Sequence, residues 1–132
     1  MKTYTKRDNT PVVAVQLDLE TDGFTYEKWG STQRCRRRDW LVNNQGEVYT
    51  VNADSFAATY REVSHGLYIK TAKVWAEKAA EAGSIQTKEG LSNYEAGDYL
   101  VYNKEHRQDG YAMSAEKFHA LYEENDPSSA DD

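Results

Sequence analysis

The sequence predicts a small α+β domain, built from two tandem, diverged repeats that pack as one compact domain with an approximate twofold relation. The main observation is that two segments, about sixty residues apart, share the same order of residue types. Each reads Asp-aromatic-Leu-Val, then acid-x-Tyr, then a helix-capping residue followed by Ala-acid-x-Phe-x-x-x-Tyr-x-Glu. A second observation is the length of 132 residues, because a unit of about sixty residues buries little core by itself. We therefore expect the two halves to pack on each other.

The repeat predicts where the chain divides. Residues 1–65 form the first repeat and residues 66–125 the second. Residues 126–132 are acidic and have almost no apolar content, so we predict a disordered tail.

Each repeat is expected to begin with a strand and a polar stretch. Residues 11–17 are apolar after a proline, which is tolerated at the first position of a strand. Residues 68–76 are a loose counterpart in the second half. Polar stretches that contain Gly23 and Gly83 follow these segments. Residues 74–82 are rich in Ala and Glu, and the pattern leaves open whether they form a helix or a strand.

A hairpin is predicted next in each repeat. Residues 40–42 and 47–51 flank an Asn-Asn-Gln-Gly segment, whose residue types accept the positive φ of tight turns. Residues 99–102 and 111–113 are expected to form the same hairpin around a longer loop.

A short helix is predicted after each hairpin. Asn52 and Ser114 are typical N-cap residues, and the acidic residue two positions later suits the positive end of the helix dipole. The Phe and Tyr of each repeat are spaced i, i+4 and share one helical face.

Charge and composition exclude some classes of function. The net charge of −6 lies entirely in residues 66–132, and this acidic balance makes a general nucleic-acid binder an unfavoured interpretation. No apolar run reaches the roughly 20 residues of a membrane span, and the first residues lack the apolar segment of a signal peptide. With a single cysteine, Cys35, these features predict a soluble cytoplasmic protein without a membrane partner.

The hairpin and helix carry a family resemblance. The second repeat resembles a small family named for its Pro-Gly-Asp-Tyr-Gly (PGDYG) motif, at residues 97–101, Tyr111 and the Phe118-x-x-x-Tyr122 pair. In the first half the resemblance is carried by residues 39–42. Members of the family occur in bacterial and tailed-phage proteins of unassigned role. Here Ala96 and Leu100 depart from the motif, as do the two arginines before Asp39. The resemblance implies a phage-like accessory protein and brings no activity with it.

One candidate binding site is the arginine run at residues 34–38, which could contact phosphates or an acidic partner or could be a solvated loop. Cys35 lies inside it, but no histidine lies near enough in sequence to act as its base. Aromatic residues of the hairpins could complete a ligand-binding surface or could fill the core. The candidate binding residues are Arg36, Arg37, Trp40, Tyr49, Tyr99 and Tyr111.

Asp39 and Asp98 are the only candidate catalytic residues. Two close carboxylates facing each other could perform acid–base chemistry, because each would raise the pKa of the other. The alternative is that each aspartate forms the turn before a strand. His119 and Glu123 share a helical face, but a metal site needs at least one further ligand, so no metal and no cofactor is predicted.

These features favour a non-enzymatic binding module for a host protein or a small anionic ligand. The alternative is a small enzyme that acts on a nucleotide-like or phosphorylated substrate through the paired carboxylates. Assembly into a homo-oligomer is a third interpretation.

Overall fold

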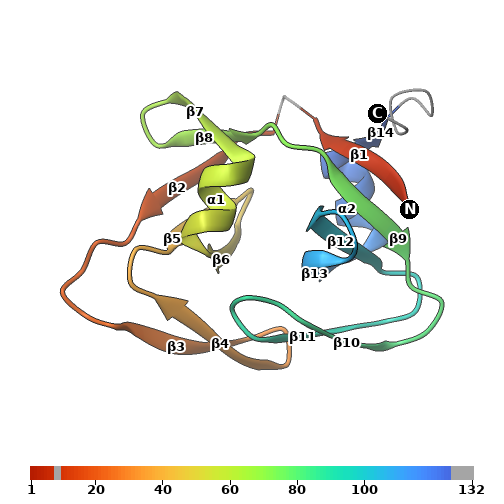
Figure 1. Ribbon diagram of the computed structural model, residues 1–132, viewed down its shortest axis with the longest axis horizontal. Helices are drawn as coiled ribbons and strands as arrows, with labels where there is room; N and C mark the ends of the chain where they lie inside the picture. The colour runs from red at the N-terminus through yellow and green to blue at the C-terminus, as the bar shows by residue number, and fades with distance from the viewer. Residues whose placement is uncertain (8–9, 126–132) are drawn as a thin grey trace.

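Two five-stranded antiparallel sheets form the frame of the protein in a computed structural model that describes residues 1–7 and 10–125 (Figure 1). We name them by their central strands. The β9 sheet contains, in order, β13 (Gln108–Met113), β12 (Tyr99–Lys104), β9 (Val74–Lys78), β1 (Lys2–Lys6) and β14 (Tyr122–Glu124). The β2 sheet contains, in order, β6 (Glu47–Val51), β5 (Trp40–Asn44), β2 (Val12–Gln16), β8 (Leu67–Lys70) and β7 (Tyr60–Ser64).

One short helix packs on each sheet. Helix α1 (Ala53–Thr59) follows β6, and helix α2 (Ala115–Leu121) follows β13. The side chain of Asn52 caps α1, and that of Ser114 caps α2, as the sequence predicts. Each helix runs directly into an edge strand, because its C-cap tyrosine already has an extended backbone.

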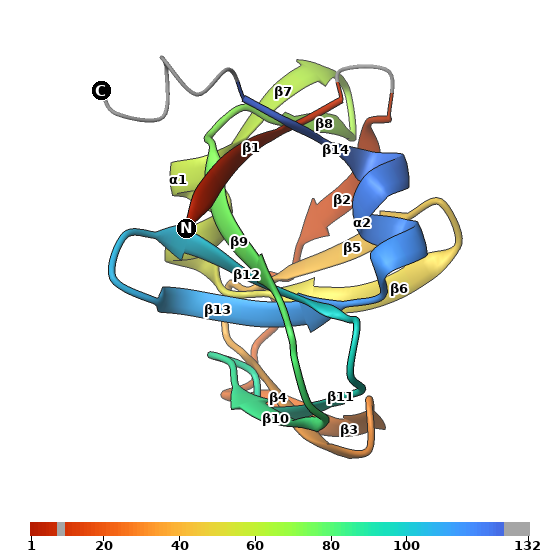
Figure 2. The same ribbon diagram turned by 90° about the vertical axis from the view of Figure 1, so that its right-hand side faces the viewer.

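Two small hairpins lie together below the sheets (Figures 1 and 2). One is β3 (Gly23–Lys28) with β4 (Ser31–Arg36), and the other is β10 (Gly83–Gln86) with β11 (Leu91–Tyr94). A bridge between Gln33 and Gly90 joins them. The amide of Gln33 also donates to the Leu91 carbonyl at 2.7 Å. The polar stretches containing Gly23 and Gly83 are therefore hairpins, which the sequence pattern did not predict.

The two sheets exchange strands. Strand β1, at the start of the chain, lies between β9 and β14, and its Tyr4 pairs with Val74 on one side and Glu124 on the other. Strand β8, from residues after 65, lies between β2 and β7. Hydrogen bonds of both sheets therefore cross the expected boundary between residues 65 and 66.

Each sheet buries its own apolar cluster against its helix. Phe118 is fully buried among residues of the β9 sheet, including Val74 and Val101. Phe56 is its counterpart over Val12 and Val42 of the β2 sheet. Because alternate residues of a strand point to opposite faces, Trp40 joins Val42 in this core and Leu41 points outward, as expected.

The structure refines two expectations and settles one open alternative. The expected strands and two short helices are present, but the protein is mostly β, because strands dominate and each helix has only 7 residues. Residues 74–78 are strand β9, which settles the open helix-or-strand alternative. The segment 68–76 is not one strand but the end of β8 and the start of β9, and β9 alone takes the central place that β2 has in its sheet.

The expected tail at residues 126–132 lies outside the described residues. Within the described part of the chain, neither helix has the length or apolar character to span a bilayer.

Candidate functional site

Asp39 and Asp98 each close a turn of the same design. The carboxylate of Asp39 accepts from the backbone N–H of Arg36 at 2.9 Å, and that of Asp98 accepts from Glu95 at 2.9 Å. Each aspartate N–H donates back to the carbonyl of the same partner, at 3.1 Å in both turns. The buried carboxylate of Asp39 also accepts from the N–H of Ala53 at 3.0 Å. These contacts are those of turn-forming aspartates, and the Asp39 carboxylate also bonds the first residue of helix α1.

Three of the candidate aromatic residues, Trp40, Tyr49 and Tyr99, are half-buried and pack against the two apolar clusters. Trp40 stacks on Phe56 with ring centroids 4.0 Å apart, and Tyr99 stacks on Phe118 at 4.2 Å. Burial raises the pKa of the Tyr49 hydroxyl. These rings supply core area and leave little surface for a ligand.

Tyr111 takes part in a polar contact between the sheets. Its hydroxyl accepts from Lys70 Nζ at 2.8 Å and lies 3.0 Å from the hydroxyl of Tyr122. Lys70 belongs to the β2 sheet, whereas the two tyrosines belong to the β9 sheet. Tyr111 is therefore a residue of the inter-sheet contact and not an exposed binding residue.

The side chains of Arg36 and Arg37 lie in different surroundings. The Arg36 guanidinium donates to the Lys88 carbonyl at 2.7 Å and so supports the loop between β10 and β11. Arg37 is exposed beside a shallow hollow that it shares with residues 20–22. The structure does not bring these arginines together with the candidate aromatic residues.

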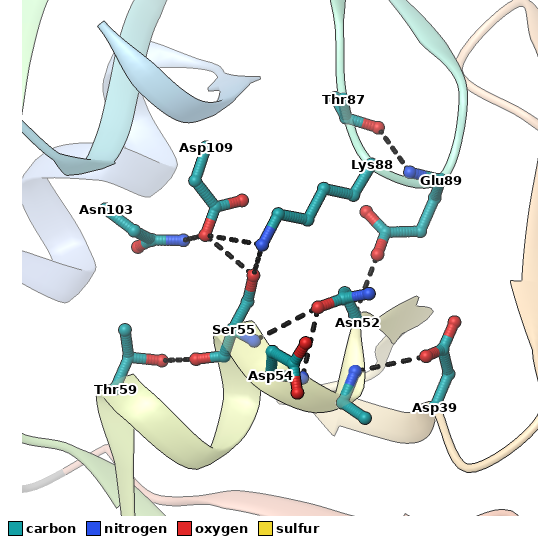
Figure 3. A network of polar contacts seen from close by, with 11 residues as sticks. Asp39, Asn52, Asp54, Ser55, Thr59, Thr87, Lys88, Glu89, Asn103 and Asp109 are labelled. Carbon is teal, nitrogen blue, oxygen red and sulfur yellow. Dashed lines mark hydrogen bonds and ion pairs between the residues drawn. The ribbon is translucent and has the colours of Figure 1, made fainter. Parts of the chain in front are cut away.

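A polar network that the sequence did not reveal joins the β10–β11 loop, which Arg36 supports, to helix α1 (Figure 3). Lys88 Nζ donates to Ser55 Oγ at 2.6 Å and lies 3.7 Å from the carboxylate of Asp109. The same Asp109 oxygen accepts from Ser55 Oγ at 2.7 Å and from Asn103 Nδ2 at 3.1 Å. Three distant segments therefore meet at Asp109: helix α1, the β10–β11 loop and the β12–β13 hairpin.

Glu89 extends this network to the helix N-terminus. Its carboxylate accepts from the backbone N–H of Asn52 at 2.8 Å (Figure 3). Burial raises the pKa of Glu89 to about 7, and the negative charges of Asp39 and Asp109 add to the effect. Glu89 is thus a carboxyl group that titrates near neutral pH.

A hollow of about 350 Å³ opens beside the network, and we call it the Lys88 recess. Its wall includes Thr87, Lys88, Tyr102, Arg107, Asp109 and Gly110. The Arg107 guanidinium lies 5.9 Å from the ring centroid of Tyr102 and pairs with Glu77. A Cβ on Gly110 would lie 2.6 Å from that ring, so only glycine lets the tyrosine approach the hairpin this closely. The recess presents two cations, an aromatic ring and one carboxylate.

Ser55 and Lys88 do not form a nucleophile–base pair. A serine is activated by a neighbour that removes its proton. Here Lys88 donates to Ser55, and the hydroxyl donates in turn to Asp109. The arrangement is a charge-assisted hydrogen-bond chain that positions Lys88 at the recess.

Cys35 is buried, and that burial raises the pKa of its thiol, which disfavours the thiolate that a nucleophile needs. Among residues 1–7 and 10–125, the structure contains no group of three His, Cys, Asp or Glu side chains arranged to hold a metal ion.

The sequence offered little signal for Lys88, Asp109 and Ser55. They lie in separate elements, and their charge and hydroxyl groups are ordinary for exposed loops and helices. Asp109 has a φ of 56°, a left-handed conformation that the residue type alone does not predict.

Comparisons with protein-family models, with curated proteins and with solved structures gave no match.

Proposed function

We propose that this protein is a non-enzymatic, phage-like cytoplasmic binding module, and that it takes a small phosphorylated or otherwise anionic ligand in the Lys88 recess. The observation that carries the proposal is that two cations line one hollow, Lys88, which pairs with Asp109, and Arg107, which pairs with Glu77. Its volume of about 350 Å³ is at the lower end of the range usual for small-molecule sites.

The recess favours a ligand with three features. An anionic group would compete with Glu77 for Arg107, whose fork of donors suits phosphate and carboxylate and is held by the Glu77 carboxylate in this structure. A flat ring would lie on Tyr102, and a hydroxyl or amine would donate to Asp109. A nucleoside monophosphate combines all three.

Arg36 has a role in this proposal because it supports the β10–β11 loop. By donating to the Lys88 carbonyl, its guanidinium holds the segment that carries the Lys88 side chain. Arg36 is then a positioning residue, whereas Arg37 lines a different hollow.

The proposal is tested by titrating the protein calorimetrically with adenosine monophosphate and with inorganic phosphate. Arg107→Gln should weaken binding of the nucleotide at least tenfold, the equivalent of roughly 1.4 kcal/mol. Arg37→Gln is the matched control and should leave the affinity unchanged. Loss of binding in Arg37→Gln alone would move the site to the arginine run, and no binding by the unaltered protein would remove the proposal.

We also infer that the two halves are diverged tandem repeats with an approximate twofold relation. Support comes from the paired turns of Asp39 and Asp98, from the two capped helices, and from the like positions of β2 and β9 in their sheets.

The paired-carboxylate enzyme stays a hypothesis, and the turn contacts of Asp39 and Asp98 favour the structural interpretation of both residues. A host-protein partner and a homo-oligomer stay predictions.

A further inference from the structure

A cluster of buried lysines and tyrosines lies where the two sheets meet. Lys6 pairs with Tyr122 at one edge of the β9 sheet, and Lys70 pairs with Tyr60 at one edge of the β2 sheet. We call the group the inter-sheet cluster, and its members are Lys6, Lys70, Tyr49, Tyr60, Tyr111 and Tyr122. Each sheet thus contributes one lysine and two tyrosines.

Both lysines are withdrawn from water. The residues Lys6 and Lys70 are each only 4% exposed. Lys6 Nζ has no hydrogen-bond partner among the described residues. A buried ammonium without a partner is costly, because it loses its hydration and receives nothing in return.

Lys70 is only partly compensated. It donates to the Tyr111 hydroxyl at 2.8 Å, and its Nζ lies 5.0 Å from the Tyr111 ring and 5.6 Å from the Tyr122 ring. Such ring contacts offset part of the loss of hydration, but they bring no negative charge. Among the described residues, no carboxylate lies within ion-pair distance of either lysine.

We propose that the inter-sheet cluster binds a small monatomic anion, with chloride as its common occupant, at the ammonium group of Lys6. The cluster is rich in donors, since lysines and tyrosine hydroxyls both donate to an anion. A bound anion would supply both the charge and the acceptor that Lys6 lacks. It would also lie near Lys70, whose charge interacts with that of Lys6.

The proposed binding depends on the protonation of the lysines. Burial lowers the pKa of Lys6 to about 8 and that of Lys70 to about 7, and repulsion from Lys6 contributes to the Lys70 shift. The groups that face Lys70 are Tyr60, Tyr111 and Tyr122, whose hydroxyl pKa values are raised by burial, and Asp109, whose charge favours protonated Lys70. The anion should therefore bind at pH 6 and be released at pH 9.5.

The test is thermal unfolding of the full chain at pH 6 and constant ionic strength, with sodium chloride exchanged stepwise for sodium gluconate. The large gluconate ion should not enter an enclosed cluster, so we expect a saturable rise in the unfolding midpoint with chloride alone. The rise should disappear at pH 9.5 and in Lys6→Met, which keeps the apolar stem. Lys2→Met, on the exposed start of the same strand, is the matched control and should retain it.

Two results would overturn the proposal. One is an equal chloride effect in Lys6→Met and Lys2→Met, and the other is no difference between chloride and gluconate in the unaltered protein. Should Lys6→Met fail to fold, crystals of the unaltered protein grown with bromide provide a direct measurement. An anomalous bromine peak beside Lys6 Nζ would support the site, and its absence would refute it.

Discussion

At the scale of single residues, two kinds of buried ionisable group have opposite effects on stability. Glu89 keeps its proton up to about pH 7 in the folded protein, whereas its ordinary pKa is 4.5. Lys70 loses its proton at about pH 7, whereas its ordinary pKa is 10.5. Between pH 4.5 and 7 the folded state therefore binds more protons at Glu89, and between pH 7 and 10.5 the unfolded state binds more at Lys70.

These signs predict a minimum of stability near pH 7. The Glu89 contribution to the free energy of unfolding falls as pH rises to 7, and the Lys70 contribution increases with pH above 7, each by about 1.4 kcal/mol per pH unit at most. Urea unfolding between pH 5 and 9.5 measures this profile. Glu89→Gln should flatten the acidic side only, and Lys70→Met should reduce the alkaline rise only, leaving the part that Lys6 contributes above about pH 8. An unchanged profile in both variants would contradict the assignment.

At the scale of elements, the β3–β4 hairpin depends on one glycine. Gly23 has a φ of 127°, and a Cβ there would collide with the backbone carbonyl of Cys35 on the paired strand. Gly46, in the β5–β6 turn, has a φ of 97° but open space around it. The two positions share a backbone conformation that favours glycine but differ in steric room.

Alanine substitutions at these two glycines should distinguish the destabilisation due to backbone strain from that due to steric collision. Gly46→Ala should cost only the roughly 1–2 kcal/mol of a left-handed alanine. Gly23→Ala should cost more, because β3 must also move away from β4, and it should increase amide hydrogen exchange across that hairpin. The free energy of unfolding and the exchange rates are the measurements. An equal decrease in the free energy of unfolding at the two sites would show that the β3–β4 hairpin shifts to accommodate the Cβ at no further cost.

At the scale of the whole molecule, the exchanged strands join the two halves. Strand β1 is an inner strand of the β9 sheet, and β8 is an inner strand of the β2 sheet. A half-chain cut at residue 65 would lose an inner strand and expose two unpaired strand edges, which are prone to aggregate.

Residues 1–65 and 66–132, expressed separately, should therefore fail to fold alone and should fold when mixed. The amide region of NMR spectra is the measurement: each fragment should give poorly dispersed signals, and an equimolar mixture should recover the dispersion of the intact chain. A well-dispersed spectrum from residues 66–132 alone would contradict this view of the fold.

Local patterns determined the local elements of this protein. The hairpins at β5–β6 and β12–β13 and the caps Asn52 and Ser114 were predictable, because turn and capping chemistry acts between residues close in sequence. The core positions of Phe56 and Phe118 followed from their place on a helical face. The candidate binding residues stay a prediction, and the half-buried rings of Trp40 and Tyr99 stack on core phenylalanines, which no sequence pattern specified.

The strand exchange, the Lys88 recess and the inter-sheet cluster follow from long-range folding, which no local pattern specifies. Each joins residues far apart in the chain, such as Ser55 with Asp109 and Lys70 with Tyr111. Residue types favour particular turns, helix caps and buried faces. The pairing of strands that are distant in sequence depends instead on which sheet edges are unpaired once the local elements have formed. The turn and cap patterns therefore predicted the hairpins and helices, whereas the strand exchange between the two sheets is visible only in the folded molecule.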